Sequence, residues 1–296
     1  MLKPLKRSPG AELRKRMGGD LVVLPGVWDA ITARIAEGAG AQGLYLTGAG
    51  VTNSQLGTPD VALLTLLEMA EQARNVCDAV SIPVIADADT GYGGTWNVLR
   101  AVREFERAGL AGMHIEDQVI PKKCGHLDGK ELVSREEMES KVRAAVQART
   151  DDSFLVVART DARGVSGLEE AVARAKAYVM AGADVIFPEG LESKEEFAEF
   201  RSRVDAPLLA NMTEFGKTPL ITVDEFRSLG YNLVIFPMTA FRVMMKAVED
   251  AVRVLLSEGT QQPLLERMRT RQELYDLIEY GKYEELDKTL SRVEKD

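Results

Sequence analysis

The chain has 296 residues, of which 45% are hydrophobic, so it can bury a large core, and we expect one compact domain spanning residues 1–296. Its 37 basic and 46 acidic residues give a net charge of −9, which argues against nucleic-acid binding and favours an enzyme of small molecules. Two cysteines cannot build a disulfide framework, no apolar run reaches the roughly 20 residues of a membrane helix, and the N-terminus lacks a signal-peptide pattern, so we expect a cytoplasmic protein.

Residues 1–20 are expected to form an N-terminal arm, and eight short apolar runs follow it. Stretches with helical periodicity separate these runs, such as 97–109 and 167–182, which both end on a glycine suited to a helix C-cap. This alternation predicts a (β/α)8 barrel, with an open doubly wound sheet as the alternative. The expected strands are LVVLP (21–25), GLYLTG (43–48), PVIADAD (83–89), GMHIED (112–117), FLVVARTD (154–161), VIFPEG (185–190), PLLANM (207–212) and LVIFPM (233–238).

The chain continues well beyond the last expected strand. Residues 239–259 and 264–290 both have helical patterns, which is more than one closing helix requires. No Pro/Gly/Ser-rich linker precedes them, so they do not indicate a second domain. We expect residues 259–296 to form a helical extension that either caps the barrel or packs on another subunit.

Polar residues close most of the expected strands. In a barrel of this type the active site lies at the carboxyl ends of the strands, so these side chains are the first candidates for catalysis and binding. Side chains two residues apart in a strand point to the same side. The candidates are Asp87 and Asp89, His114 and Glu116, Arg159 and Asp161, Glu189, and Asn211.

Asp87, Asp89 and Glu116 predict an acidic metal site. An all-oxygen ligand set suits Mg²⁺ or Mn²⁺ rather than zinc, which favours His and Cys. The alternative is that these acids cap helices or pair with basic residues at the rim. The glycine-rich run GYGGTWN (91–97) lacks the lysine and hydroxyl residue of a phosphate-binding loop, so a tight turn is a sufficient interpretation.

The segment HIEDQVIPKKCGHL (114–127) contains both histidines of the chain. Its polar part is long enough to fold over the site as a lid, with Cys124 facing the metal and flanked by Lys122, Lys123 and His126. Cations beside a thiol favour its ionised form and suit it to proton donation or nucleophilic attack. The alternative is an inert surface loop with a chance cysteine. Cys77 lies in a helical pattern and is expected to be a small core residue.

Seven motifs together carry a family resemblance. YLTGAG, DADTGYGG, HIEDQVIPKKCGHL, VVARTDA, FPEG, LANMTEFGKTP and FPMTAFR span nearly the whole chain. With them the chain resembles the isocitrate lyase and phosphoenolpyruvate mutase superfamily, and within it the branch of the 2-methylisocitrate lyases. KKCGH is typical of the carbon–carbon lyases of that superfamily, and NMTEFGKTP is typical of the branch.

The resemblance implies a Mg²⁺-dependent barrel that assembles as a homotetramer, with C-terminal helices exchanged between paired subunits. It implies that Asp87 and Asp89 bind the metal and that Glu116 supports it through water. Two departures affect the pocket: Thr47 stands where the branch has a serine, and Ala49 follows the next glycine. The implied substrate-binding residues are Thr47, Gly48, Ala49, Cys124, Gly125, His126, Arg159, Glu189, Asn211, Met212, Thr213, Arg242 and Arg271.

The implied reaction cleaves 2-methylisocitrate to pyruvate and succinate, a step of the methylcitrate cycle in propionate catabolism. Cys124 would return a proton to the succinate fragment, while His114 and Arg159 hold substrate oxygens. Tyr45 and Asp60 are both candidates for the base that takes the hydroxyl proton. His126 either binds a substrate carboxylate or braces the lid.

Other functions remain open at this stage. A 2,3-dimethylmalate lyase or an oxaloacetate-cleaving enzyme differs by pocket changes of one methyl group, worth roughly 1–3 kcal/mol. A phosphonopyruvate or carboxyphosphonoenolpyruvate mutase would use the same acids without a lid thiol. A metal-binding barrel without turnover is the third class, and an assay of the purified protein distinguishes all of these.

Overall fold

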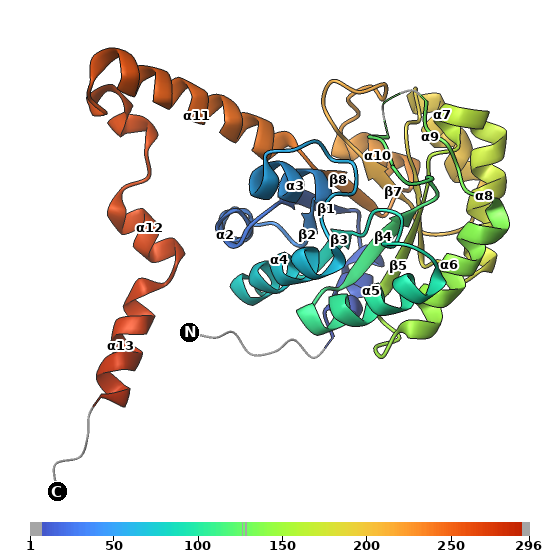
Figure 1. The fold of residues 1–296 in the computed structure, drawn as a ribbon, viewed down its shortest axis with the longest axis horizontal. Helices are drawn as coiled ribbons and strands as arrows, with labels where there is room; N and C mark the ends of the chain where they lie inside the picture. Colours follow the sequence, from blue (N-terminus) through green and yellow to red (C-terminus); the bar gives the residue numbers. More distant parts are fainter. Residues whose placement is uncertain (1–7, 126, 128, 292–296) are drawn as a thin grey trace, which may run out of the picture. The chain divides into compact units, whose positions relative to one another are not determined.

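The structure, a computed structural model, describes residues 8–125, 127 and 129–291 (Figure 1). Eight parallel strands in this part of the chain form one sheet in the order β6-β5-β4-β3-β2-β1-β8-β7. A parallel bridge between Ile186 and Leu208 joins the outer strands, so the barrel is nearly closed and the predicted (β/α)8 fold is confirmed. The strands are β1 Val22–Val27, β2 Leu44–Leu46, β3 Val84–Asp87, β4 Gly112–Glu116, β5 Leu155–Thr160, β6 Val185–Pro188, β7 Leu209–Asn211 and β8 Leu233–Phe236.

All eight predicted strands are present, but most are shorter than expected at their carboxyl ends. In β2 the reason is local. Thr47 accepts a hydrogen bond from the backbone N–H of Gly50 at 3.2 Å, so this residue caps a helix instead of continuing the strand. The last residues of several expected strands, such as Asp89 and Asp161, lie on the loops at the barrel rim.

The helices between the strands cover the outer face of the sheet (Figure 1). Helix α5 shows why they form: its buried residues recur every three or four positions, and it ends at Gly109, whose φ of +89° favours glycine. The helices of this part are α1 Pro9–Met17, α2 Ala30–Gly38, α3 Gly48–Leu56, α4 Leu66–Ala79, α5 Thr95–Ala108, α6 Arg135–Ala148, α7 Arg163–Ser166, α8 Leu168–Met180, α9 Lys194–Arg203 and α10 Val223–Leu229.

The expected N-terminal arm contains helix α1, which belongs to the barrel core. Leu13 and Met17 are buried in one cluster with strand residues such as Leu24 and Leu155. Arg14 also donates a hydrogen bond from Nε to the carbonyl of Ser153, at the start of β5, at 2.8 Å. The helix therefore closes the barrel at the ends of the strands opposite to the rim discussed below.

We expect Leu13→Ala to lower the free energy of unfolding by about 2–5 kcal/mol, because Leu13 is fully buried and its removal leaves a cavity. Chemical denaturation of the two proteins measures the difference. Leu67→Ala is a matched control, because Leu67 is 54% exposed on α4. An equal stability of Leu13→Ala and wild type would show that α1 does not contribute to the core.

The chain divides into two compact units, a barrel unit of residues 5–240 and a C-terminal unit that begins at Phe241. Helix α11, Thr239–Glu258, starts in the barrel unit, and it confirms the helix expected at 239–259. It is followed by a 3-10 helix, Gln262–Arg267, and by the α-helices α12, Arg271–Leu277, and α13, Tyr280–Leu290.

The helical pattern over 264–290 does not form one continuous helix. Thr270 and Glu273 form a capping box that starts α12 as a new helix. Glu279 then adopts a left-handed conformation with φ of +57°, which separates α12 from α13. Helical periodicity alone did not reveal these two breaks.

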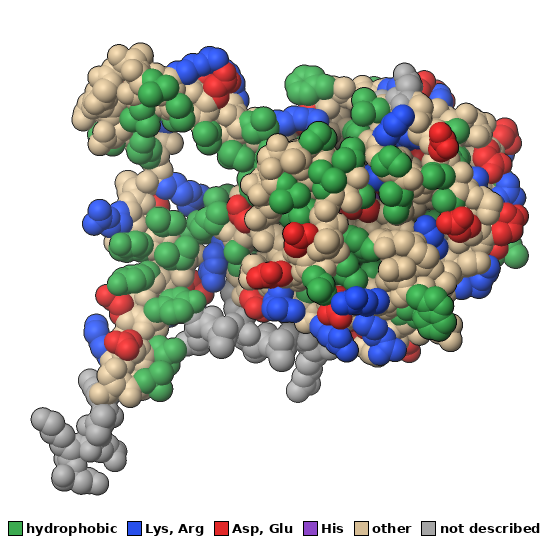
Figure 2. All heavy atoms as spheres, in the orientation of Figure 1, with side chains coloured by type: hydrophobic (Ala, Val, Ile, Leu, Met, Phe, Trp, Pro, Cys, Tyr) green, Lys and Arg blue, Asp and Glu red, His purple; other side chains and the backbone are tan. Residues whose placement is uncertain are grey.

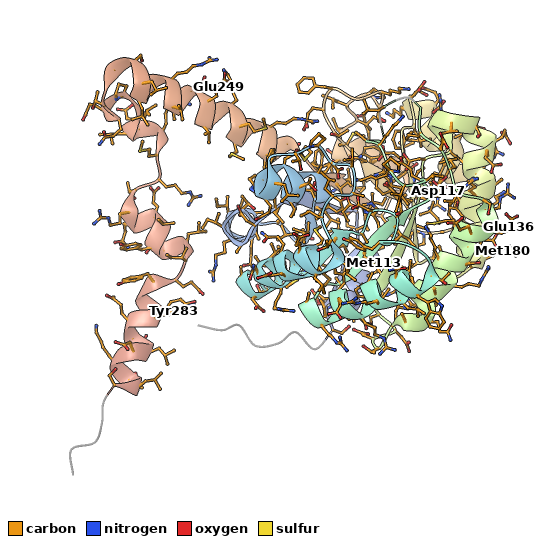
Figure 3. All side chains as sticks on the ribbon, in the orientation of Figure 1. Met113, Asp117, Glu136, Met180, Glu249 and Tyr283 are labelled. Carbon is orange, nitrogen blue, oxygen red and sulfur yellow. The ribbon has the colours of Figure 1, made fainter. Side chains whose placement is uncertain are left out.

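Helices α11 to α13 carry many hydrophobic side chains on their surface, as Figure 2 shows. Leu256 is 83% exposed and Leu290 is 74% exposed, and Tyr283, labelled in Figure 3, is half exposed. Exposed apolar surface of this extent is typical of segments that pack against another chain. None of the described helices is both long and apolar enough to cross a membrane.

We expect a chain that stops after Glu258 to lose its native oligomeric state or to aggregate, because the segment removed contributes apolar faces such as those of Leu265, Leu274 and Leu290. Analytical ultracentrifugation of the full and shortened chains gives the two masses. A shortened chain that stays soluble with an unchanged mass would show that the segment only decorates the barrel.

Candidate active site

Asp87, His114 and Tyr45 form a buried row at the carboxyl ends of β2, β3 and β4. Asp87 pairs in register with His114, and its Oδ1 lies 3.1 Å from Nε2 of the imidazole. The other ring nitrogen, Nδ1, lies 3.4 Å from the hydroxyl of Tyr45, and the two rings stack. These contacts fix the direction of the Asp87 carboxylate.

The electrostatics of this row follow from burial and from the neighbouring charges. Burial raises the pKa of Asp87, but His114 and Lys122 outweigh it and hold the pKa well below its usual range. Burial and the negative charge of Asp87 raise the pKa of Tyr45 well above its ordinary value. Asp87 is therefore ionised and Tyr45 is neutral near neutral pH.

The start of α3 lies against the Asp87 carboxylate. A Cβ atom built on Gly48 would lie 2.7 Å from Oδ2 of Asp87, so only glycine allows this approach. Thr47 caps the same helix, and its hydroxyl also contacts Sδ of Met238 at 3.6 Å. Backbone N–H groups at a helix start attract anions, which suits Gly48 and Ala49 to a substrate carboxylate, whereas the N–H of Thr47 already donates to the carbonyl of Val27 at 3.1 Å.

Lys122 joins two further acids. Its ammonium Nζ lies 2.6 Å from Oδ1 of Asp89 and 2.8 Å from Oδ2 of Asp60, and its side chain is buried. Burial raises the pKa of Asp89 to about 6 against the opposing effect of Lys122. The alternative that a rim acid pairs with a basic residue thus describes Asp89 and also Glu116, which lies 3.2 Å from Nε of Arg159, whereas Asp87 pairs with a histidine.

Arg159 is the centre of a second cluster, formed by β4, β5 and β6. Its Nε lies 2.9 Å from Asp161 and 3.2 Å from Glu116, and its NH1 lies 3.3 Å from Glu189. Its guanidinium also lies 5.1 Å from the centre of the Phe187 ring. Burial lowers the pKa of Arg159, but the three carboxylates raise it well above its usual range.

The polar part of 114–127, predicted to form a lid, lies in the loop after β4, and Gly125 of this loop lies directly on the Arg159 cluster. A Cβ atom built on Gly125 would lie 2.4 Å from Cγ of Glu189 and 2.6 Å from NH2 of Arg159. Cys124 is exposed. His126 lies outside the described residues, so neither of its two expected roles is tested.

The cations expected around the thiol have other partners. Lys122 reaches Asp60 and Asp89, and Nζ of Lys123 donates to the carbonyl of Gly129 at 2.7 Å. Cys77, expected in the core, is only half-buried on α4, where it faces Gly109 at the end of α5.

The end of β7 supplies another part of the rim. Asn211 donates a hydrogen bond from Nδ2 to Oε2 of Glu189 at 3.0 Å, and its Oδ1 is buried without a hydrogen-bond partner among the described residues. Met212 and Thr213 are buried beside it. Arg242 and Arg271 belong to the C-terminal unit, so their assignment to the pocket stays a prediction.

Three charged residues near the rim were not singled out from the sequence for the contacts they make: Lys122, Lys130, whose Nζ lies 2.9 Å from Oδ1 of Asp161, and Asp117, which accepts a hydrogen bond from the N–H of Asp161. Lys122 was noted only as a neighbour of the thiol, although two adjacent lysines after an acidic strand end were a usable signal. Asp117, labelled in Figure 3, follows β4 directly. Lys130 left no signal, because its partner Asp161 is 31 positions away.

The acidic residues at the rim suit a partly hydrated magnesium ion rather than a metal bound by protein side chains alone. Within residues 8–125, 127 and 129–291, no three His, Cys, Asp or Glu side chains form a group that could hold a metal by itself. Mg²⁺ usually retains several waters and binds through one or two carboxylates plus the substrate, so it does not require such a group. One buried atom, Oε1 of Glu116, has no hydrogen-bond partner in the described part of the chain. An ionised Asp87 and this oxygen fit a hydrated Mg²⁺ at the rim.

Comparison with known proteins supports the resemblance seen in the motifs. The family model described as phosphoenolpyruvate phosphomutase matches residues 12–256. The chain is 56% identical to a 2-methylisocitrate lyase of Aeropyrum pernix over 98% of this chain and 93% of the relative. It is 46% identical to a 2-methylisocitrate lyase of Bacillus subtilis over 97% of this chain and 96% of the relative.

Solved structures resemble the fold over nearly the whole chain. A 2,3-dimethylmalate lyase has a TM-score of 0.90 at 38% identity and covers 97% of this chain and 96% of its own. An oxaloacetate acetylhydrolase in complex with the inhibitor 3,3-difluorooxalacetate also has a TM-score of 0.90, at 37% identity, with 97% of this chain and 98% of its own covered.

A phosphonopyruvate hydrolase in complex with oxalate and Mg²⁺ has a TM-score of 0.86 at 29% identity, over 95% of this chain and 98% of its own. A divalent metal is thus present in at least one relative with this fold. Because the family model covers most of the chain and the relatives match it nearly end to end, the chain belongs to the phosphoenolpyruvate mutase and isocitrate lyase superfamily.

Proposed function

We propose that this protein is a 2-methylisocitrate lyase, a carbon–carbon lyase that forms pyruvate and succinate. The observation that carries the proposal is the 56% identity to a relative of that name over 98% of the chain. The rim supports it, because it combines an ionised Asp87, the start of α3, Arg159 and the segment that bears Cys124. Such a site is suited to a substrate with several carboxylates.

We propose Mg²⁺ as the metal, with Mn²⁺ as a possible substitute, held by Asp87 and Asp89, with Glu116 acting through water. When bound, the ion supplies Lewis-acid stabilisation of the substrate hydroxyl and the adjacent carboxylate. A magnesium ion at Asp89 requires the ammonium of Lys122 to share that carboxylate or to move towards Asp60, since Lys122 pairs with both acids.

The protein's own residues would orient the substrate and stabilise its charges. Gly48 and Ala49 lie at the start of α3 beside Asp87, where their N–H groups would face a substrate carboxylate, and Thr47 would contribute its hydroxyl. Arg159 is held rigidly by three carboxylates, so it can face substrate oxygens without reorganising. His114 contacts Asp87 through Nε2 and Tyr45 through Nδ1, so both ring nitrogens are engaged and it would orient Asp87 rather than hold a substrate oxygen itself.

The cleavage requires two proton transfers, and we assign them to Asp60 and Cys124. Removal of the hydroxyl proton allows the carbon–carbon bond to break, which leaves a carbanion on the succinate fragment and a ketone on pyruvate. Tyr45 is poorly suited to accept the first proton, because its raised pKa keeps the phenol neutral near neutral pH. We therefore assign this role to Asp60. Cys124 would donate its thiol proton to the carbanion, so its S–H bond breaks as the new C–H bond forms.

A substrate panel tests the proposed function. We expect ketoacid formation with 2-methylisocitrate in the presence of Mg²⁺, and much slower turnover of isocitrate, 2,3-dimethylmalate, oxaloacetate and phosphonopyruvate. Ketoacid release can be followed in a coupled assay. A higher kcat/KM for any other compound would replace the proposed substrate with that compound.

Two related activities are the second candidates. The folds of a 2,3-dimethylmalate lyase and an oxaloacetate acetylhydrolase match this chain with a TM-score of 0.90 each. Pocket differences of one methyl group change selectivity by roughly 1–3 kcal/mol, so small changes at Thr47 and Ala49 can separate these activities. A phosphonate mutase is less favoured, because its reaction has no role for Cys124.

We further propose that the protein acts as a homotetramer in the cytoplasm. The exposed hydrophobic side chains of α11 to α13 support association with further copies of the chain, and the shortened chain described above tests it.

A further inference from the structure

Lys130 lies outside every role assigned above, yet it is buried and charged. Its side chain is 2% exposed, and that of its partner Asp161 is fully buried. The ammonium Nζ lies 2.9 Å from Oδ1 of Asp161 and donates a hydrogen bond to the carbonyl of Gly125. Burial of a lysine is unfavourable unless the ammonium is paired and hydrogen-bonded, so the contacts of Lys130 are specific.

The partner Asp161 is a fixed point of the barrel. Its backbone N–H donates to Oδ1 of Asp117 at 2.9 Å. Asp117 is in turn held by the hydroxyls of Thr160 and Tyr178, at 2.8 and 2.7 Å, and by Arg174 at 3.1 Å. These partners come from β5 and α8, so they anchor Asp117, and through it the backbone of Asp161, to the barrel.

Asp161 also connects Lys130 to Arg159. One carboxylate accepts from both cations, with Nε of Arg159 at 2.9 Å from Oδ2. Burial alone would raise the pKa of Asp161, but Arg159 and Lys130 outweigh it and lower the pKa to about 2. The carboxylate is therefore ionised and can bind both cations at once.

The other bond of Lys130 goes to the carbonyl of Gly125 in the loop after β4. Gly125 sits against Arg159 and Glu189 so closely that a Cβ atom would overlap both side chains. Residue 124 is joined to Gly125 directly, so its place over the rim follows from that of Gly125. Between Gln118 and Lys123 the loop is held by two side-chain hydrogen bonds of 2.9 Å, and Lys130 ties Gly125 to Asp161 of the barrel.

We propose that Lys130 is a positioning residue of this site: by binding Asp161 and the Gly125 carbonyl together, it holds Gly125 against Arg159 and Glu189 and so places Cys124. The proposal rests on the proposed function only for its activity measurement. Lys130 does not touch the reacting atoms and acts through Gly125.

The test compares Lys130→Met with wild type in the full-length protein. Methionine keeps an unbranched side chain but removes the charge and the donors. We expect kcat and kcat/KM for 2-methylisocitrate to fall together by on the order of 100-fold, because a shift of about 1 Å in a catalytic group has that effect. Lys130→Arg, which keeps the charge, should fall between wild type and Lys130→Met.

Amide hydrogen exchange supplies a measurement that needs no substrate. We expect the amides of Lys123 and Leu127 to exchange at least about tenfold faster in Lys130→Met, because the loop loses its tie to the barrel. The amide of Asp161 should keep its protection, since Asp117 holds it. Lys194→Met is the matched control: Lys194 is an exposed lysine paired with Glu225 at 2.9 Å, and its loss should leave both measurements at wild-type values.

The outcomes separate the alternatives. If the loop of Lys130→Met exchanges its amide hydrogens at the wild-type rate, the proposal is overturned, whether or not kcat falls. A lower kcat without faster exchange would mean that Lys130 acts on the substrate directly rather than through Gly125. If Lys130→Met does not fold, Lys130→Gln is measured in its place, with the same expectations. If the wild-type protein does not turn over 2-methylisocitrate, the proposed function is contradicted. The exchange measurement still decides the role of Lys130 in that case.

Discussion

Cys124→Ser should lower kcat for 2-methylisocitrate by about 10²- to 10⁴-fold, the usual contribution of a general acid, while KM changes little. Serine keeps the size and the hydrogen-bonding capacity of cysteine, but an aliphatic hydroxyl is a much weaker acid than a thiol. Because Cys124 is exposed in the structure, the substitution leaves the core intact. Steady-state kinetics with purified proteins of equal stability measures the effect.

Cys77→Ser is the matched control, because it makes the same change at a half-buried position on α4. Its kcat should stay close to that of wild type. If Cys124→Ser turns over 2-methylisocitrate nearly as fast as wild type, the thiol is not the proton donor. A rise in KM with an unchanged kcat would instead show that Cys124 contributes to the pocket wall.

Removal of divalent metal with EDTA should abolish turnover, and Mg²⁺ should restore it. The physical reason is that both fragments develop negative charge as the carbon–carbon bond breaks, and few groups other than a metal stabilise two adjacent oxygens. Asp87→Asn should weaken Mg²⁺ binding by more than about 100-fold, because it removes the ionised carboxylate at the rim without leaving a void beside Gly48. Isothermal titration calorimetry with Mg²⁺ gives the affinities.

Asp78→Asn provides the control for the loss of one negative charge, because Asp78 is exposed on the outer helix α4. It should bind Mg²⁺ as wild type does. Full activity of the protein after exhaustive EDTA treatment contradicts the proposed metal dependence, whichever substrate proves to be preferred.

The sequence by itself determined the barrel and its active rim. Strands that are buried on both faces consist of nearly continuous apolar residues, and the helices between them bury one face, so the two periodicities identified all eight repeats. Because parallel strands present their carboxyl ends at one face, Asp87, His114, Arg159 and Glu189 could be grouped from the order of the elements alone.

The tertiary structure decided which charges pair. Lys122 reaches Asp60, 62 positions away, and Lys130 reaches Asp161, 31 positions away. Such contacts depend on strand register and on the path of the loop after β4, and neither follows from local sequence patterns. For this reason the lysines interpreted as neighbours of the thiol proved to bind carboxylates and a backbone carbonyl.

The end of the chain shows the same division between local pattern and tertiary contact. Helical periodicity was sufficient to predict α11, but it joined α12 and α13 into one helix, because a capping box at Thr270 and a left-handed residue at Glu279 leave the apolar spacing unchanged. Periodicity reports which residues can share a face, whereas capping and backbone conformation determine where a helix ends. The sequence therefore identified the fold and the rim that carries the chemistry, and only the folded chain determined the ion pairs that hold this rim in place.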